Sequence, residues 1–437
     1  MIADLYDLFL RSKGVNTDTR TIRPGQLFFA LKGETFDGNA YALKALDAGA
    51  MAAVVTEGPD WPGDARLIPV PDTLQTLKDL AAWHRNHVRG DKHLPVIGLT
   101  GTNGKTTTKE LIREVLSKKY RVTATEGNFN NDVGVPLSLL RITPETEIAV
   151  IEMGANHPDD IEKLVCVSQP DFGLITNVGK AHLLGFGSLE GVMAAKGKLY
   201  DWLSAHDGVA FVNVDDERLL GMARARSLSI LPYGLLYAGA SVLPLTGEHP
   251  FVGISLPGGV EVRTRLVGAY NAANVMAALA VAAHFEVPLE DAVAAIEAYE
   301  PSNNRSQLVH TGRGNHVIVD AYNANPSSMA AALDNFDAIS SPSKVVLLGS
   351  MGELGADSAS EHERIVRRLL ATQGLERICL VGEAFAAAAS ACHSEGISLF
   401  PDSAALAAAL KETPLSGCTI LLKGSRSQKM ETVLPEL

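Results

Sequence analysis

The sequence predicts an α/β protein of three domains: a small mixed α/β N-terminal domain, a central domain built on a parallel sheet, and a C-terminal Rossmann-like domain. Three observations predict this fold class. The length of 437 residues corresponds to about three domains at ~150 residues each. Short apolar runs alternate with helical stretches in two separate series, as in parallel sheets covered by helices. A glycine-rich loop joins the first strand of the first series to an amphipathic helix.

The N-terminal domain is predicted to span residues 1–90. Strand-like runs alternate there with glycine-rich turns, and a helical stretch at 74–87 ends before Gly90. The polar segment 91–93 then precedes a new apolar strand, so we place the boundary there. The predicted strands are residues 27–31, 52–56 and 67–70.

The central domain is predicted to span residues 91–298. Its apolar runs are typical of buried parallel strands, and Leu111, Ile112 and Val115 recur on one face of the first helix. In such sheets, ligands bind at the carboxyl ends of the strands. The predicted strands are residues 94–100, 122–125, 148–151, 172–178 and 209–214.

The C-terminal domain is predicted to span residues 299–437. An alanine-rich helical stretch stops near Pro301, and a second alternating series follows, which predicts a smaller doubly wound sheet. The predicted strands are residues 317–320, 345–349, 378–382 and 420–424. The predicted helices are residues 327–339, 361–373, 383–391 and 403–411.

Composition excludes several classes of protein. Hydrophobic residues make up 46% and charged residues 20%, which excludes a disordered chain. With 38 Lys and Arg against 50 Asp and Glu, the net charge of −12 disfavours a broad nucleic-acid-binding face. The four cysteines form no CxxC pair, so neither a zinc ribbon nor a disulfide framework is indicated. No uninterrupted run of ~18 apolar residues occurs, and residues 1–4 lack the basic region of a signal peptide. We therefore expect a cytoplasmic protein without membrane insertion.

The most specific local signal is the segment GLTGTNGKTT at residues 98–107. It lies between a strand and a helix, where glycines let backbone N–H groups and the helix N-terminus bind phosphate. Lys105 would reach the terminal phosphates of ATP and the Thr106 hydroxyl would hold Mg²⁺. The usual loop spacing requires glycine at Leu99, so a chance turn is the alternative. Glu152, at the end of strand 148–151, is a candidate Mg²⁺ ligand or else a surface acid. The predicted phosphate-loop residues are Gly101, Thr102, Asn103, Gly104, Lys105, Thr106 and Thr107.

Taken together, the loop and several ordered motifs resemble the Mur ligase family, which makes amide bonds in cell-wall precursors. The short GTNGKTTT loop is that family's own variant, so the departure at Leu99 supports the resemblance. The further motifs are residues 127–131 (GNFNN), 134–137 (GVPL), 152–154 (EMG), 176–182 (TNVGKAH), 195–197 (AKG) and 213–216 (NVDD). Folylpolyglutamate synthases are relatives of this family.

The segment DAYNANP at residues 320–326 resembles the signature of one branch of the family. That branch joins D-alanyl-D-alanine to UDP-N-acetylmuramoyl-tripeptide. Residues 348–355, 423–426, 17–20 and 25–34 also resemble it. The resemblance implies ATP-dependent amide bond formation through an acyl phosphate, in peptidoglycan precursor synthesis. The alternatives are another Mur-family or folylpolyglutamate-type ligase, a catalytically idle P-loop binding protein, and a nucleic-acid-dependent ATPase.

The resemblance also implies roles for individual residues. The catalytic residues would be Lys105, Glu152, His182 and Lys196, and two Mg²⁺ ions would be held by Thr106, Glu152, His182 and Lys196. In the family, the lysine that matches Lys196 is carbamylated. The remaining nucleotide contacts would be Asn271 and Asn274, which face adenine, and Arg305, Asp320, Tyr322, Asn323 and Asn325 from the C-terminal domain.

The substrate contacts implied by the resemblance lie in two places. The UDP end would be held by Thr19, Arg20, Lys32, Gly33, Glu34 and Asp37, and the peptide and acceptor region by Asn130, Asn131 and Ser350. Closure of the C-terminal domain would complete the site and exclude water. The expected partners are the two substrates, with no nucleic acid, and the chain is expected to be a monomer.

Overall fold

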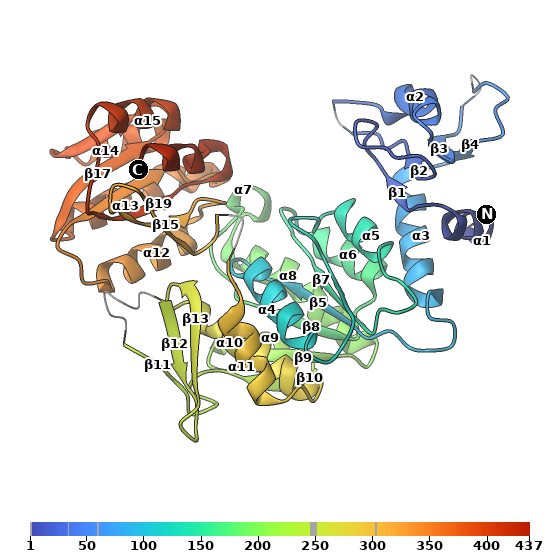
Figure 1. The fold of residues 1–437 in the computed structure, drawn as a ribbon, viewed down its shortest axis with the longest axis horizontal. Helices are drawn as coiled ribbons and strands as arrows, with labels where there is room; N and C mark the ends of the chain where they lie inside the picture. Colours follow the sequence, from blue (N-terminus) through green and yellow to red (C-terminus); the bar gives the residue numbers. More distant parts are fainter. Residues whose placement is uncertain (1, 34, 59–60, 245–250, 302–303) are drawn as a thin grey trace.

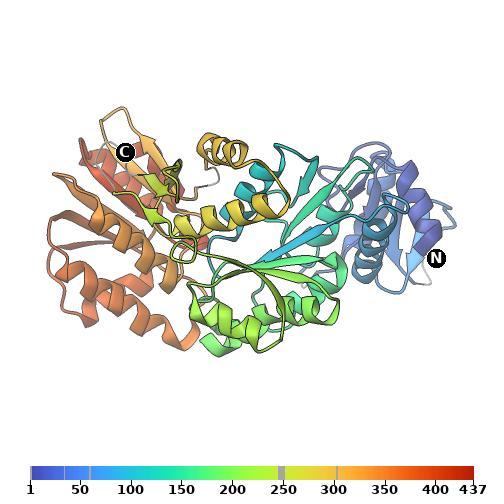
Figure 2. The same cartoon turned by 90° about the horizontal axis from the view of Figure 1, so that it is seen from below.

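The computed structural model describes residues 2–33, 35–58, 61–244, 251–301 and 304–437. Three α/β regions follow one another along the chain. The N-terminal and C-terminal regions lie on opposite sides of the central region in both views (Figures 1 and 2). The predicted three-part α/β fold is confirmed.

The N-terminal region is built on a four-stranded parallel sheet in the order β1-β2-β3-β4. Its strands are β1 (Val15–Asn16), β2 (Leu27–Phe29), β3 (Ala52–Thr56) and β4 (Leu67–Val70). Its helices are α1 (Ile2–Arg11), η1 (Gly38–Tyr41), α2 (Ala42–Asp47) and α3 (Thr73–His87). The Asp72 side chain begins α3 by accepting hydrogen bonds from the N–H groups of Leu74 and Gln75. This helix leads into the central region.

The central region is built on a six-stranded parallel sheet in the order β10-β9-β8-β5-β7-β6. The strands are β5 (Val96–Thr100), β6 (Val122–Ala124), β7 (Ile148–Glu152), β8 (Phe172–Ile175), β9 (Val209–Asn213) and β10 (Ser229–Tyr233). The helices are α4 (Lys105–Leu116), α5 (Gly134–Leu139), α6 (Asp160–Ser168), α7 (Leu183–Phe186), α8 (Leu189–Ala205), α9 (Glu217–Arg224), α10 (Asn271–His284) and α11 (Leu289–Ala298). All five predicted strands are present, and β10 was not predicted.

One predicted strand is longer than the observed one. The sequence predicts a strand at 172–178, but β8 ends at Ile175. The next residues turn toward the phosphate loop instead: the Thr176 hydroxyl donates to the Asn103 carbonyl (2.6 Å), and the Thr102 N–H donates to the Asn177 carbonyl (3.0 Å). Thr176 and Asn177 therefore leave the strand because they hydrogen-bond to that loop.

A small antiparallel sheet was not predicted. It consists of β11 (Ser241–Val242), β12 (Phe251–Ser255) and β13 (Glu261–Val267). Exposed and buried residues alternate along most of β13, so a period of two was present in the sequence. Figure 1 shows this sheet beside the C-terminal region.

The C-terminal region is built on a six-stranded sheet in the order β14-β15-β19-β16-β17-β18. Only the edge strand β14 pairs antiparallel. The strands are β14 (Gln307–His310), β15 (His316–Asp320), β16 (Lys344–Gly349), β17 (Leu375–Val381), β18 (Ile397–Phe400) and β19 (Thr419–Lys423). The helices are α12 (Pro326–Ala338), η2 (Gly355–Asp357), α13 (Ser358–Ala371), α14 (Glu383–Ala391), α15 (Ser403–Glu412), η3 (Arg426–Gln428) and η4 (Met430–Glu436). The four predicted strands and four predicted helices are present within a few residues, and the edge strands β14 and β18 were not predicted.

The apolar cores join the three regions unequally. One core includes Leu77 and Leu80 of α3 together with Val135 and Leu139 of α5, so it runs from the N-terminal region into the central sheet. The cores of the C-terminal sheet stay within that region, except that Val267 of β13 belongs to one of them and Phe251 of β12 packs against it. Within the part of the chain that the structure describes, no helix has the length and hydropathy needed to cross a bilayer.

Candidate active site

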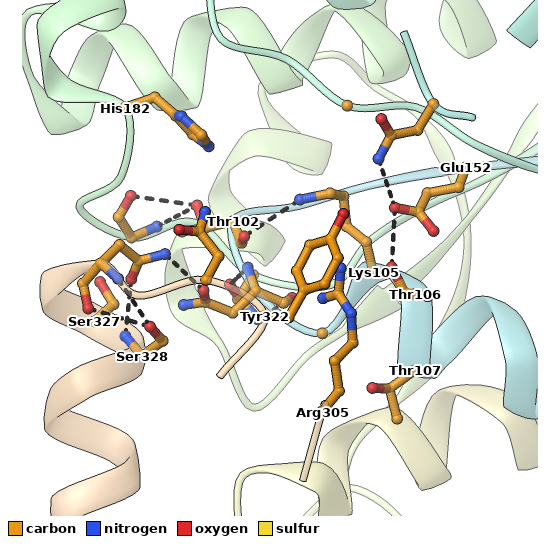
Figure 3. Close-up of a pocket in the computed structure, with 18 of the residues that line it drawn as sticks. Thr102, Lys105, Thr106, Thr107, Glu152, His182, Arg305, Tyr322, Ser327 and Ser328 are labelled. Atoms are coloured by element: carbon orange, nitrogen blue, oxygen red, sulfur yellow. Dashed lines mark hydrogen bonds between the residues drawn. The ribbon is translucent and has the colours of Figure 1, made fainter. Parts of the chain in front are cut away.

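A cleft of about 770 Å³ lies between the central and C-terminal regions. It brings together side chains that the sequence separates by more than two hundred residues, because the carboxyl ends of β5, β7 and β8 face those of β15 and β19. Figure 3 shows Lys105, Thr106 and Glu152 on one side, with Arg305 and Tyr322 opposite. The predicted residues that line the cleft are Thr102, Asn103, Gly104, Lys105, Thr106, Thr107, Asn130, Asn131, Glu152, His182, Asn271, Asn274, Arg305, Asp320, Tyr322, Asn323 and Asn325.

The phosphate loop adopts a conformation that requires its glycines. Gly104 has φ +79° and caps the N-terminus of α4. Gly101 has φ +151°, and a Cβ there would lie 1.9 Å from the Thr176 hydroxyl oxygen. The first turn of α4 has N–H groups without helical partners, and it opens into the cleft. The loop is therefore shaped to receive an anion.

Lys105 supplies the positive charge of this loop. Its ammonium donates to the carbonyl oxygens of Gly101 (2.8 Å) and Thr102 (3.3 Å). Burial lowers the pKa of Lys105, while the nearby carboxylate of Glu152 acts in the opposite direction. The ammonium thus lies folded against the loop, where an anionic ligand can compete for it.

Glu152 ends β7 and is 1% exposed. Its Oε1 accepts hydrogen bonds from the Thr106 hydroxyl (3.2 Å) and from the Asn130 amide (2.8 Å). Its other oxygen, Oε2, is buried and has no hydrogen-bond partner among the described residues. A buried carboxylate oxygen left without a donor is suited to a cation.

His182 lines the same cleft, and Lys196 is buried in α8 without lining it. His182 precedes α7 and has a left-handed backbone with φ +50°. Burial lowers the pKa of its imidazole, which favours the neutral ring. Lys196, on α8, is 2% exposed, and its ammonium lies 5.8 Å from the centre of the Phe186 ring. Burial holds the pKa of Lys196 well below its ordinary value, and the positive charge of Lys105 lowers it further.

The four predicted metal ligands would bind a cation only together with a bound nucleotide. They are Thr106, Glu152, His182 and Lys196. No three His, Cys, Asp or Glu side chains gather closely enough to bind a metal ion by themselves, as far as the described residues show. The unpartnered oxygen of Glu152 beside the Thr106 hydroxyl fits one Mg²⁺ whose remaining ligands are phosphate oxygens and water. The cation sites therefore depend on the nucleotide.

The C-terminal side of the cleft presents cations and amides. The Arg305 guanidinium lies over the Tyr322 ring at 3.7 Å, and the Arg305 Nε is buried and unpartnered among the described residues. Asn325 begins α12 with a capping box, and its amide donates to the Asn103 side chain across the cleft (2.9 Å). Asn325 therefore links the DAYNANP segment directly to the phosphate loop.

Two buried asparagines at the start of α10 face the phosphate loop. The Asn274 amide donates to the Asn271 side-chain oxygen (2.8 Å), and the Asn271 amide donates to the Val267 carbonyl (2.8 Å). A Cβ at Gly104 would lie 2.7 Å from the Asn274 Oδ1, so α10 approaches the loop closely. Both residues line the cleft, together with Tyr270.

Other predicted residues lie away from the cleft lining. Gly101 and Lys196 are buried and do not line the cleft; their surroundings are described above. Ser350 is 5% exposed at the end of β16, where its hydroxyl donates to the Val381 carbonyl (3.0 Å), so it supports the loop rather than lining the cleft.

The described residues predicted to hold UDP lie in loops of the N-terminal region. Arg20 forms an exposed ion pair with Asp18 (2.7 Å). The backbone of Lys32 forms an isolated antiparallel β-bridge with that of Asp37. Thr19 and Gly33 are in the same loops, and Glu34 lies outside the described residues. Figure 1 shows this region on the far side of the central sheet from the C-terminal region.

Several cleft residues were not predicted. Lys423 is 1% exposed, and its ammonium donates to the Asp320 carboxylate (2.6 Å) and to the Asn323 carbonyl (3.2 Å). Arg426 lies 5.7 Å from the centre of the Tyr322 ring, and Glu353 contacts His182. Each belongs to a motif at the carboxyl end of β16 or β19, and that position was the available signal.

A P-loop domain that faces a Rossmann-like domain across one cleft is the arrangement of the Mur ligases, and the chain belongs to the Mur ligase family. Residues 99–282 match the Mur ligase middle domain, residues 304–426 the Mur ligase glutamate ligase domain, and residues 11–85 the Mur ligase family catalytic domain.

The relatives point to one branch of the family. The chain is 35% identical to UDP-N-acetylmuramoyl-tripeptide–D-alanyl-D-alanine ligase of Bacillus subtilis, over 97% of this chain and 93% of that protein. A crystal structure of MurF from Acinetobacter baumannii superposes with a TM-score of 0.86 at 32% identity, covering 100% of this chain and 98% of that one. MurF ligase from Thermotoga maritima in complex with ADP gives a TM-score of 0.84 at 26% identity, covering 98% and 97%.

Proposed function

We propose that this chain joins D-alanyl-D-alanine to UDP-N-acetylmuramoyl-tripeptide at the expense of ATP. One observation carries the proposal: the phosphate loop with Lys105 and Glu152 faces Arg305 and the DAYNANP segment across a single cleft. The first set suits a nucleoside triphosphate, and the second set brings the features of the D-alanyl-D-alanine-adding branch to the same place. The relatives named above support that branch.

The proposed chemistry has two steps. A carboxylate oxygen of the tripeptide attacks the γ-phosphorus of ATP, and ADP leaves, which gives an acyl phosphate. The free amine of D-alanyl-D-alanine then attacks the acyl carbon, loses a proton, and expels phosphate that carries the former carboxylate oxygen. Both steps concentrate negative charge, so positioned cations and N–H donors lower the barriers.

Residues on the two sides of the cleft bind different parts of the nucleotide. Lys105 and the first turn of α4 bind the β- and γ-phosphates, and Arg305 reaches the γ-phosphate from the opposite side. Asn271 and Asn274 contact the nucleotide base. Asp320, Tyr322, Asn323 and Asn325 contact the nucleotide when the two regions approach, and their approach excludes water from the acyl phosphate.

The cation ligands in this proposal are Thr106 and Glu152 for one Mg²⁺, and His182 with Lys196 for a second. The bound ions supply positive charge to the phosphate and acyl-phosphate oxygens. Lys196 suits carbamylation because burial and Lys105 favour its neutral amine. That amine can attack carbon dioxide and release a proton, which converts a cation into an anionic ligand. Rescue of Lys196→Ala by short-chain carboxylates would test this role, and complete absence of rescue would count against it.

The three regions take separate roles in the proposal. Residues 1–90 hold the UDP end of the long substrate through Thr19, Arg20, Lys32, Gly33, Glu34 and Asp37, with Arg20 and Lys32 placed for the diphosphate. Residues 91–298 bind ATP, and residues 299–437 close over it. Asn130 and Asn131 line the route of the peptide. Location in the cytoplasm and a monomeric state stay predictions from the sequence.

Phosphate release from ATP and Mg²⁺ tests the function directly. We expect release only when UDP-N-acetylmuramoyl-tripeptide and D-alanyl-D-alanine are both present, with tripeptides ending in diaminopimelate or lysine compared side by side. Replacing D-alanyl-D-alanine with glutamate tests the folylpolyglutamate-type alternative. Release that does not depend on both named substrates would refute the assignment.

A further inference from the structure

The His182 side chain is hydrogen-bonded to a residue of the C-terminal region, although His182 itself belongs to the central region. Its Nδ1 faces the Oε2 of Glu353, which follows β16. A second bond joins the same two loops, because the Leu184 N–H donates to the Glu353 carbonyl (3.2 Å). Helix α7 and η2 are in contact at this point. The pair therefore spans the cleft between the two regions.

Both partners have backbone conformations that are unfavourable for residues with side chains. His182 has φ +50° and Glu353 has φ +59°, in the left-handed region. Such conformations are unfavourable for residues with a Cβ and persist where the surrounding structure holds them. Two of them meeting at one contact indicates that the geometry of this pair is maintained by its surroundings.

The loop that carries Glu353 is held by buried hydrogen bonds. The Met351 N–H donates to Nε2 of His362, a ring that is 0% exposed (3.0 Å). The Ser425 hydroxyl donates to the Ser350 carbonyl (2.6 Å). Glu353 itself is 54% exposed, so its side chain is directed outward from a rigid base toward His182.

The chemistry of the pair fixes which ring nitrogen of His182 carries the proton. An ionised carboxylate can only accept hydrogen bonds, so Nδ1 must donate and Nε2 keeps its lone pair. Imidazole ligands of metals usually donate the other ring N–H to a carboxylate or carbonyl, which sets their tautomer and orientation. Here that carboxylate comes from the opposite region.

We propose that Glu353 is a positioning residue: from the C-terminal region, it holds His182 in the Nδ1–H tautomer and directs Nε2 toward the second cation. Assembly of that cation site then depends on the approach of the C-terminal region, which links closure to catalysis. The inference rests on the proposed role of His182 as a cation ligand.

Two variants separate positioning from direct ligation. Glu353→Ala removes the acceptor, whereas Glu353→Gln keeps an acceptor oxygen but removes the charge. Mn²⁺ binding is measured by electron paramagnetic resonance with a non-hydrolysable ATP analogue. We expect Glu353→Ala to weaken the second ion by roughly 10–100-fold, with the first ion unchanged and Glu353→Gln retaining most of the affinity. Equal loss in the two variants would make Glu353 a metal ligand, and no loss in Glu353→Ala would refute the inference.

A tautomer measurement needs neither metal nor turnover. Long-range ¹⁵N–¹H correlation spectra of histidine-labelled protein, with His182→Asn for assignment, report which nitrogen is protonated. We expect Nδ1–H in the parent and in Glu353→Gln, and Nε2–H or a mixture in Glu353→Ala. An unchanged tautomer in Glu353→Ala would overturn the inference.

The matched control is Glu363→Gln. Glu363 is on α13 of the same region and pairs with Arg367 of the same helix (2.6 Å), so its loss should move neither readout. If His182→Asn leaves the second ion unaffected, the metal role in the proposed function fails. The tautomer spectra still test Glu353 in that case, so the two failures are distinguishable.

Discussion

The central region is joined to its two neighbours in different ways. Toward the N-terminal region the junction is buried: the Arg85 guanidinium, 8% exposed, donates to the Asp171 carboxylate (2.9 Å) and to the Gln169 carbonyl (2.8 Å). His84, 3% exposed, lies between the Tyr6 hydroxyl and the Ile142 carbonyl. An apolar core continues across this junction.

Toward the C-terminal region the junction is polar and partly open. It includes the contacts of Asn325 with Asn103, of Glu353 with His182, and of Lys180 with Glu361 (2.9 Å). Polar contacts of this kind exchange readily with water and ligands, whereas a continuous apolar core does not. The N-terminal region is therefore a fixed platform, and the C-terminal region is the part that moves. Four predictions test this difference between the two junctions.

The largest effect is expected on the catalytic side of the polar junction. Lys105→Ala should lower kcat/KM by about 10³-fold, because it removes a charged donor from the transferring phosphoryl group. Its thermal stability should change little, since the loop is also held by Asn177. Steady-state phosphate release and thermal unfolding check both parts. Retained activity would remove the phosphate loop from the mechanism.

The next effect is expected on stability at the buried junction. Arg85→Met should lower the free energy of unfolding by about 2 kcal/mol. Asp171, 28% exposed, loses its charged hydrogen bond to Arg85 but keeps those to the Val96 N–H and His93. Activity per folded molecule should be unchanged. Denaturant unfolding with a parallel assay measures both. Arg66→Met is the control, since its pair with Asp64 is exposed and local. A large loss of kcat with intact stability would contradict the inference that the N-terminal region is a fixed platform.

A pH effect is expected at the same buried junction. Burial lowers the pKa of His84 from 6.5, so the folded protein keeps the ring neutral while the unfolded chain gains a proton. This contribution to stability is complete above pH 6.5 and is lost as pH falls toward the lowered pKa. The stability difference between about pH 7.5 and about pH 5.5 should therefore be smaller in His84→Gln. An identical pH dependence in the parent and the variant would argue against a neutral His84.

The smallest effect on stability is expected at the polar junction. Lys180→Met removes the ion pair with Glu361, but the lysine side chain is 53% exposed. Its loss should cost below about 1 kcal/mol of unfolding free energy. The KM for ATP should rise while kcat changes less, because the closed arrangement loses a contact. Small-angle scattering with and without nucleotide would show closure. A loss as large as that of Arg85→Met would erase the proposed difference between junctions.

The sequence predicted the parallel sheets and the cleft well for one physical reason. Buried parallel strands are continuous apolar runs, and the residues after them face the ligand, so Lys105 and Glu152 could be placed from pattern alone. Asp320 was placed through the resemblance of the DAYNANP segment. Edge strands such as β14 and β18 lack that uniform apolar signal. The antiparallel β11–β13 sheet interrupts the expected alternation and was missed.

Residues whose role depends on long-range pairing could not be found in the same way. Lys423 and Glu353 act on partners about a hundred and about 170 positions away, and only the folded arrangement shows those contacts. The resemblance placed Ser350 in the acceptor region, yet its hydroxyl turns back toward β17. The direction of a side chain at a strand end is decided by its neighbours rather than by its position in the sequence.

Transfer of ¹⁸O from the tripeptide carboxylate to phosphate is a direct test of the acyl-phosphate step. The tripeptide is labelled with ¹⁸O in its terminal carboxylate and incubated with ATP, Mg²⁺ and D-alanyl-D-alanine, and the released phosphate is analysed by mass spectrometry. Transfer through an acyl phosphate moves a carboxylate oxygen into phosphate, so the phosphate should carry ¹⁸O in step with amide formation. Amide formation with unlabelled phosphate would contradict transfer through an acyl phosphate.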